Sequence, residues 1–128
     1  YRGSLRVYKT KTFARFARKA SIRDSDLRAA VNDLARGKID ADLGGGLYKQ
    51  RLARAGHGKS GGFRVILAYR ANLRAAFIFG FAKNEMENIA PDELAALKVL
   101  GAHILGLGNE ALAKALNEGE LIEVEDHA

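Results

Sequence analysis

Two apolar segments near the middle of the chain constrain the fold more than any other feature. Residues 63–70 (FRVILAYR) and 75–82 (AAFIFGFA) are both rich in residues that favour strands, and a short segment with Asn72 at a turn separates them. Two such segments are expected to pair antiparallel as a hairpin. Residues 47–53 precede them and also have strand character. We therefore expect a three-stranded unit at the centre of the fold.

Helical patterns flank this unit on both sides. Apolar residues recur at helical spacing after Thr10 or Thr12, and again between residues 24 and 36 after a cap at Asp24 or Ser25, which predicts two short helices in a hairpin. A further helix is expected to begin at Pro91, and another at Asn109. Residues 5–8 are predicted to be a short strand, residues 39–46 and 55–62 loops, and residues 121–125 a last strand or an extended tail.

The order of these elements predicts an α+β fold, in which helices pack on one face of an antiparallel sheet. Residues 1–4 have the appearance of an expression-tag remnant. We expect residues 5–128 to form a single domain with an acidic C-terminal helical extension. No apolar run approaches the roughly 20 residues that a membrane span needs, and no signal peptide is visible, so the predicted location is cytoplasmic.

Charge is distributed very unevenly along the chain. Residues 1–84 carry 19 Lys and Arg against 5 Asp and Glu, a net charge of +14, whereas residues 85–128 carry 2 against 10, a net charge of −8. The sum is the +6 of the whole chain. A basic body followed by an acidic segment is typical of a surface that binds a polyanion, although a basic patch can also be ordinary solvated surface.

Several kinds of site are disfavoured by the sequence. The chain has no Cys and no pair of His at metal-ligand spacing, so we predict no metal site and no cofactor. Gly58-Lys59-Ser60 resembles the end of a nucleotide-binding loop, but Ala53 occupies the position where that motif needs its first glycine. The segment also joins two strands, while the motif requires a following helix.

Basic side chains on the strands are the strongest functional signal. Lys49 and Arg51 share one face of their strand because side chains alternate, Arg64 begins the next strand, and Lys83 follows the third. If the strands are neighbours, the four cations converge on one surface that can hold a phosphate and stabilise its transition state. The alternative is edge-strand charge that prevents aggregation.

Three other residues of this region are also candidates. His57, in the glycine-rich basic loop, is the histidine best placed to act as a base, and Lys59 can contact an RNA backbone if the loop is more than a flexible connection. Tyr69 either packs in the core or stacks on a base.

Three motifs stand out in this region: Lys49-Gln50-Arg51-Leu52-Ala53-Arg54, Gly58-Lys59-Ser60-Gly61-Gly62-Phe63-Arg64 and Phe79-Gly80-Phe81-Ala82-Lys83-Asn84-Glu85. Together with both ends of the chain, they resemble the RelE/ParE toxin superfamily, and most closely its HigB-like branch. The resemblance implies a RelE-like microbial RNase fold with a helical hairpin on a small antiparallel sheet. It also implies a type II toxin, neutralised by a cognate antitoxin that is expected to bind DNA.

The activity that the resemblance implies is metal-independent cleavage of mRNA on the 70S ribosome. In such enzymes the 2′-hydroxyl of the mRNA attacks the adjacent phosphate, which leaves a cyclic phosphate. Carried over by motif, the catalytic residues are Lys49, Arg51, Arg64 and Lys83. Arg64 is assigned to the scissile phosphate, Lys83 to charge stabilisation or acid catalysis, and Lys49 is a better base than Arg51 because Arg stays protonated. The predicted RNA-binding residues are Arg54, His57, Lys59, Tyr69 and Asn84.

Two other functions remain open from the sequence. A ParE-like toxin poisons DNA gyrase by binding and cleaves nothing, so it has no need of convergent cations. A non-catalytic RNA-binding module would bind with strong salt dependence but leave the RNA intact.

Overall fold

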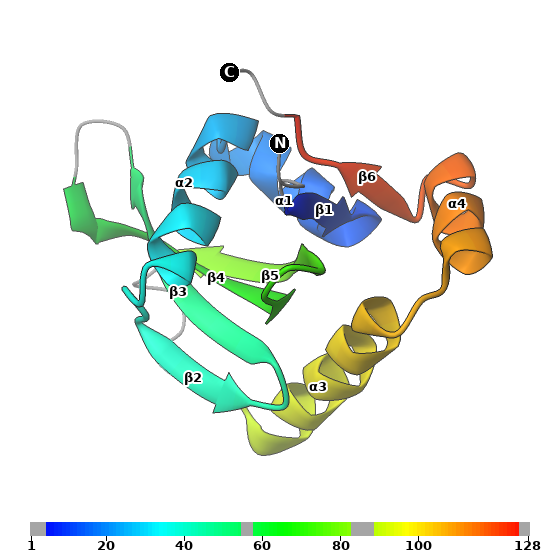
Figure 1. Ribbon diagram of the computed structural model, residues 1–128. Helices are drawn as coiled ribbons and strands as arrows, with labels where there is room; N and C mark the ends of the chain where they lie inside the picture. The colour runs from blue at the N-terminus through cyan, green and yellow to red at the C-terminus, as the bar shows by residue number, and fades with distance from the viewer. Residues whose placement is uncertain (1–4, 55–57, 83–88, 126–128) are drawn as a thin grey trace.

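The computed structural model describes residues 5–54, 58–82 and 89–125, without the side chains of residues 53, 54 and 58–61 (Figure 1). Within them the fold is α+β, as predicted, with a mixed six-stranded sheet and four helices. The elements in chain order are β1 (Arg6–Thr10), α1 (Lys11–Ala20), α2 (Asp24–Ala35), β2 (Ala41–Gly44), β3 (Leu47–Arg54), β4 (Gly58–Arg70), β5 (Arg74–Ala82), α3 (Pro91–Leu105), α4 (Asn109–Asn117) and β6 (Leu121–Glu123).

The strands lie in the order β2-β3-β4-β5-β1-β6. The expected hairpin is present: β4 and β5 pair antiparallel from Phe63 opposite Ala82 to Arg70 opposite Arg74. Its turn contains Asn72 with a φ of 65°, a left-handed conformation that Asn tolerates better than most residues. The expectation of a purely antiparallel sheet is wrong, because β1 pairs parallel with β5. A parallel pair needs a long connection, and here residues 11–73 provide it.

Two predicted loops are partly strand. Residues 39–46 were expected to be a loop, but Ala41–Gly44 form edge strand β2, with Ala41 opposite Lys49. Successive left-handed φ values of 90°, 65° and 85° at Gly44, Gly45 and Gly46 make the turn into β3. The second predicted loop, residues 55–62, ends earlier than expected because β4 begins at Gly58.

Local signals locate the helices well and their caps less well. The Thr10 side chain accepts a hydrogen bond from Phe13 N at 3.1 Å, and Pro91 occupies the first turn of α3 before Asp92 and Glu93. The predicted caps of the other two helices are wrong. Helix α2 has Arg23 at its N-cap, with Asp26 accepting from Arg23 N, and α4 has Gly108. Asp24 and Asn109 are instead the first residues of these helices.

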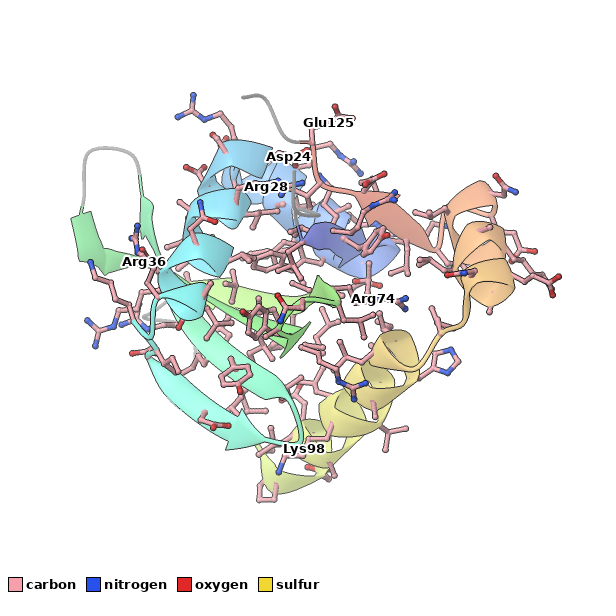
Figure 2. The ribbon with its side chains drawn as sticks, in the orientation of Figure 1. Asp24, Arg28, Arg36, Arg74, Lys98 and Glu125 are labelled. Carbon is pink, nitrogen blue, oxygen red and sulfur yellow. The ribbon has the colours of Figure 1, made fainter. Side chains whose placement is uncertain are left out.

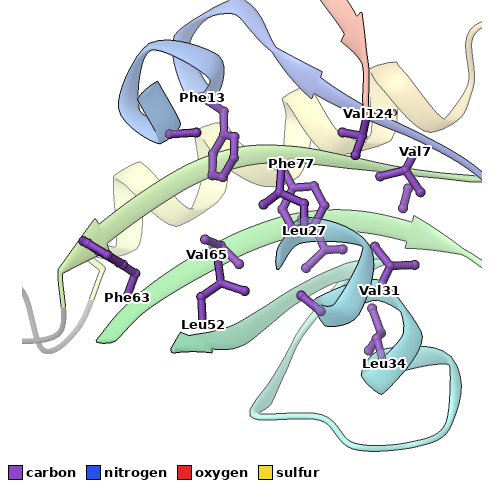
Figure 3. Close-up of a cluster of buried hydrophobic side chains, with 14 residues drawn as sticks. Val7, Phe13, Leu27, Val31, Leu34, Leu52, Phe63, Val65, Phe77 and Val124 are labelled. Atoms are coloured by element: carbon purple, nitrogen blue, oxygen red, sulfur yellow. The ribbon is translucent and has the colours of Figure 1, made fainter. Parts of the chain in front are cut away.

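Helices cover both faces of the sheet, so the prediction that they pack on one face is wrong (Figure 1). On one face, α1 and α2 enclose an apolar cluster with alternate residues of the strands (Figure 3). Phe13 of α1 and Phe77 of β5 meet in this cluster with their ring centroids 5.4 Å apart, and Val31 of α2 joins them. The alternate strand residues point to the other face and require a second apolar cover.

Helix α3 provides that second cover. Its residues Ile104 and Leu105 are buried with Leu47, Ile66 and other residues of β3, β4 and β5. The helix approaches so closely at Gly101 that a methyl group there would lie 3.1 Å from Leu47 Cδ1. The acidic C-terminal part of the chain therefore belongs to the core, because α3 packs on the sheet and β6 pairs antiparallel with β1.

Several charged residues outside β3 and β4 join distant segments of the fold. Asp24 accepts from Lys9 Nζ at 2.7 Å and from Glu125 N at 2.8 Å, and Arg28 donates to Val124 O at 3.1 Å (Figure 2). Buried Arg74 donates to the carbonyl of Ile104 in the last turn of α3 and to that of Leu107 just after the helix. These groups are engaged in holding segments of the fold together.

The strand β6 is also joined to β1 by an ion pair. Arg6 donates from Nε and Nη2 to the carboxylate of Glu123 at 2.9 and 3.1 Å. This hydrogen bonding raises the pKa of Arg6 above its ordinary value. Both side chains are exposed, so the pair contributes little to stability.

Candidate functional site

Three of the four predicted catalytic residues lie together on one face of the sheet. Arg51 of β3 stands directly opposite Arg64 of β4, and Lys49 stands opposite Ile66, two residues further along the same face. Ile66 belongs to the apolar cluster under α3, so the three cations share the α3 face of the sheet. Strand alternation and antiparallel register together produce this arrangement.

A carboxylate that the sequence analysis did not select completes the group. Asp40 Oδ1 accepts from Arg51 Nε at 2.9 Å, while Asp40 Oδ2 lies 3.9 Å from both Lys49 Nζ and Arg64 Nε. The side chains of Asp40 and Arg64 are largely buried, with exposed fractions of 14% and 11%, whereas that of Arg51 is 52% exposed. We call Asp40, Lys49, Arg51 and Arg64 the cation cluster.

Asp40 was missed because residues 39–46 were expected to form a loop, which has no register with β3. As an edge strand, β2 pairs Ala41 with Lys49 and so brings Asp40 beside Arg51. The available signal was the position of an acidic residue just before the glycines in a strongly basic part of the chain. That signal alone does not identify a partner.

The buried side chain of Gln50 fixes the backbone at Asp40 from the opposite face of β3. Its Oε1 accepts from Asp40 N at 2.9 Å, and its Nε2 donates to Lys38 O at 2.9 Å and to Ala30 O at 3.3 Å. Gln50 is 3% exposed, so water cannot reach its side-chain amide, and these protein hydrogen bonds satisfy the amide instead. The backbone that carries the Asp40 carboxylate is thus tied to α2 and to the segment that follows it.

The cation cluster retains a net positive charge, because three cations surround one carboxylate. Each arginine approaches Asp40 with its Nε, which leaves the Nη side of the planar guanidinium for another anion. Arg64 Nη1 makes a contact of 3.5 Å with Phe63 O, which is long for a hydrogen bond. Two arginine forks and an ammonium group are well suited to hold a phosphate.

A cavity of about 380 Å³ adjoins the cluster at the sheet edge. Asp40 and Arg51 line it from the cluster side, and its other lining residues come from α2, β3 and the segment between α2 and β2: Asp33, Lys38, Ile39 and Gln50. Its volume falls within the range of small-molecule and nucleotide pockets. A ligand group bound there would contact both Asp40 and Arg51.

Tyr69 is not brought to the cluster. It lies on the opposite face of β4 from Arg64, where its ring packs edge-on against Tyr48 with centroids 6.0 Å apart. The surroundings of Tyr69 are therefore those expected for core packing, the first of the two roles that the sequence left open. Arg54 and Lys59 belong to β3 and β4, but their side chains are not described. His57, Lys83 and Asn84 lie outside the described residues.

Within 5–54, 58–82 and 89–125, no three His, Cys, Asp or Glu side chains gather closely enough to hold a metal ion. In the same ranges, no helix has the length and apolar character required to cross a membrane.

Comparison with protein families agrees with the resemblance found in the sequence. Residues 5–124 match the model of the family described as the RelE toxin of the RelE/RelB toxin–antitoxin system. Because the match covers nearly the whole chain, the protein belongs to this family of toxins. Membership implies a cognate antitoxin. No individual curated protein gives a significant match.

Proposed function

We propose that this toxin is a ribosome-dependent mRNA endoribonuclease of the HigB-like kind, acting in the cytoplasm and neutralised by its cognate antitoxin. The observation that carries the proposal is the meeting of Lys49, Arg51 and Arg64 on one face of the sheet, beside an open cavity. Such a group suits the stabilisation of a phosphate that gains negative charge in the transition state.

In the proposed reaction, the 2′-hydroxyl of the mRNA attacks the adjacent phosphorus and the bond to the 5′-oxygen breaks. The products are a cyclic phosphate and a 5′-hydroxyl. Arg64 holds the scissile phosphate from its largely buried position, and the more exposed Arg51 binds the same phosphate or its neighbour. Lys49 supplies a mobile ammonium group on the same face. Lys83, by its motif, adds a fourth cation.

In this proposal the ribosome positions the mRNA substrate, a task for which a small protein with an open site lacks the means. A single strand of mRNA must be held so that its 2′-hydroxyl lies in line with the breaking bond, and positioning of this kind accounts for a large part of many rate enhancements. We propose that the mRNA is held in this way on the 70S ribosome while the cation cluster contacts its backbone. The predicted RNA-binding residues Arg54, His57, Lys59 and Asn84 extend this contact.

Primer extension on total mRNA after brief induction in cells tests the proposal. Wild-type protein should produce new 5′ ends inside translated reading frames, and Arg64→Ala should reduce them by about 10²- to 10³-fold, the usual cost of removing one charge-stabilising donor. Arg70→Ala is the matched control, since it removes an exposed arginine from the other end of the same strand. Arg70→Ala should produce the wild-type pattern.

Two results would contradict the proposal. Growth arrest with intact mRNA and gyrase-dependent DNA damage would indicate a ParE-like toxin. Salt-dependent RNA binding without any new 5′ ends would indicate a non-catalytic RNA-binding module. Equal cleavage by wild type and Arg64→Ala would preserve the activity but remove Arg64 from its site.

A further inference from the structure

The cation cluster lacks an obvious proton acceptor among its basic residues. Attack by a 2′-hydroxyl requires a group that takes the proton, and arginine stays protonated at any physiological pH. Lysine side chains ordinarily titrate near pH 10, so an amine is rarely free at neutral pH, whereas aspartate ordinarily titrates near pH 4 and is ionised. Asp40 is the described carboxylate that contacts all three cations.

We propose that Asp40 is the general base of the reaction, an inference that rests on the proposed nuclease function. The two oxygens of its carboxylate have different surroundings. Oδ1 is engaged by Arg51 Nε at 2.9 Å, whereas Oδ2 lies 3.9 Å from Lys49 Nζ and from Arg64 Nε, beyond hydrogen-bond range. Oδ2 is therefore the oxygen that can accept a proton from a hydroxyl group of the substrate.

The position of Oδ2 agrees with this role. A phosphate held by Arg64 and Lys49 would lie beside Oδ2, because both cations already approach that atom. The adjoining cavity, which Asp40 lines, offers space for the nucleotide that carries the attacking hydroxyl. Gln50 holds the Asp40 backbone, so little reorganisation is needed when the substrate binds.

Residues of the cation cluster can accept and supply all the protons that the step requires. The 2′-hydroxyl proton moves to Asp40 Oδ2 while the bond between the 2′-oxygen and phosphorus forms. The bond between phosphorus and the 5′-oxygen breaks, and the departing oxygen takes a proton from the ammonium group of Lys49. Asp40 has then gained one proton and Lys49 has lost one. Transfer from the carboxylic acid to the neighbouring amine restores both groups, and no other reactant is consumed.

The test is single-turnover cleavage of mRNA on programmed ribosomes by wild type, Asp40→Asn and Asp42→Asn. Asn at residue 40 keeps an oxygen that can accept from Arg51 Nε but cannot take a proton, so cleavage should slow about 10²- to 10⁴-fold. Binding to the programmed ribosome should be retained or strengthened, because a negative charge is lost near the RNA. Asp42, exposed on β2, is the matched control for that loss of charge.

The site of proton transfer is resolved by a second substrate. In an mRNA whose scissile bond has a 5′-sulfur in place of the 5′-oxygen, the leaving group departs without a proton. This substrate should restore cleavage to Lys49→Ala, which lacks the acid, but not to Asp40→Asn, which lacks the base. A residue that only positions Arg51 would not show a large loss in the Asn variant, because Asn keeps an oxygen that accepts from Arg51 Nε.

The outcomes separate the two proposals. If wild type cleaves and Asp40→Asn cleaves within about threefold of it, the base assignment is overturned and the nuclease stands. Equal losses in Asp40→Asn and Asp42→Asn also overturn it, since the effect then follows net charge. If wild type produces no cut on programmed ribosomes, the nuclease proposal fails and the base assignment fails with it. Asp40→Glu, which keeps a carboxylate, should recover part of the rate if Asp40→Asn is slow.

Discussion

The two ends of the α3 face of the sheet are built from the same strands but have opposite character. Along β3, every second residue on this face runs from buried Leu47 through Lys49 to exposed Arg51. Along β4, the equivalent series runs from Ala68 through Ile66 to Arg64. Helix α3 covers the first end and contacts Leu47 and Ala68 through Gly101. The cation cluster occupies the second end.

This difference explains how a small domain can carry a charged site without losing its core. The apolar end is buried by α3 and contributes to stability, while the cationic end keeps access to solvent through the half-exposed Arg51. The opposite face of the sheet, covered by α1 and α2, supplies most of the remaining core. A substitution at the apolar end should therefore affect stability, and one at the cationic end should affect function.

The largest expected effect on stability is at the centre of the cluster under α1 and α2. Phe77 is fully buried and its ring packs against Phe13, so Phe77→Ala should lower the free energy of unfolding by about 3–5 kcal/mol. Denaturant unfolding followed by circular dichroism measures this loss. The half-exposed Leu73 provides the control, and Leu73→Ala should cost less than about 1 kcal/mol. Equal losses in the two variants would mean that the apolar cluster under α1 and α2 is not the main core.

The comparison between the two ends is tested most directly by two neighbours on one strand. Ile66→Ala should lower the free energy of unfolding by about 2–5 kcal/mol, because Ile66 is fully buried under α3. Arg64→Ala should change the free energy of unfolding far less while abolishing most of the cleavage. Unfolding curves of both variants, read beside their primer-extension patterns, measure the contrast. A large loss of stability in Arg64→Ala would show that its cation is structural.

The smallest predicted effect concerns the residue that connects the core to the cation cluster. Gln50→Ala removes three hydrogen bonds and leaves Asp40 N without its acceptor, which should cost about 1–3 kcal/mol of stability. If the position of Asp40 matters for cleavage, the rate should also fall by about 10- to 100-fold. Asn117→Ala, an exposed amide on α4, is the control for both measurements. An unchanged rate in Gln50→Ala would show that Asp40 needs no such support.

Much of the local structure could be predicted from the sequence. The hairpin of β4 and β5, the four helices and the shared face of Lys49 and Arg51 all follow from the periods of 2 and 3.6 residues. These patterns act over a few residues and need no knowledge of distant segments. The helix caps at residues 23 and 108 were misplaced by one or two residues, because neighbouring polar residues offer similar signals at a helix start.

Only the tertiary structure decided the remaining features. The parallel pairing of β1 with β5 joins residues almost 70 positions apart, and α3 packs on the face that the sequence analysis left uncovered. The contact of Asp40 with Arg51 and Arg64 depends on an edge strand that has no strong pattern of its own. Local propensity cannot encode which segments pair, because that choice depends on the burial of apolar area over the whole chain. The sequence by itself determined which residues carry charge on β3 and β4, and the fold decided that a carboxylate meets them.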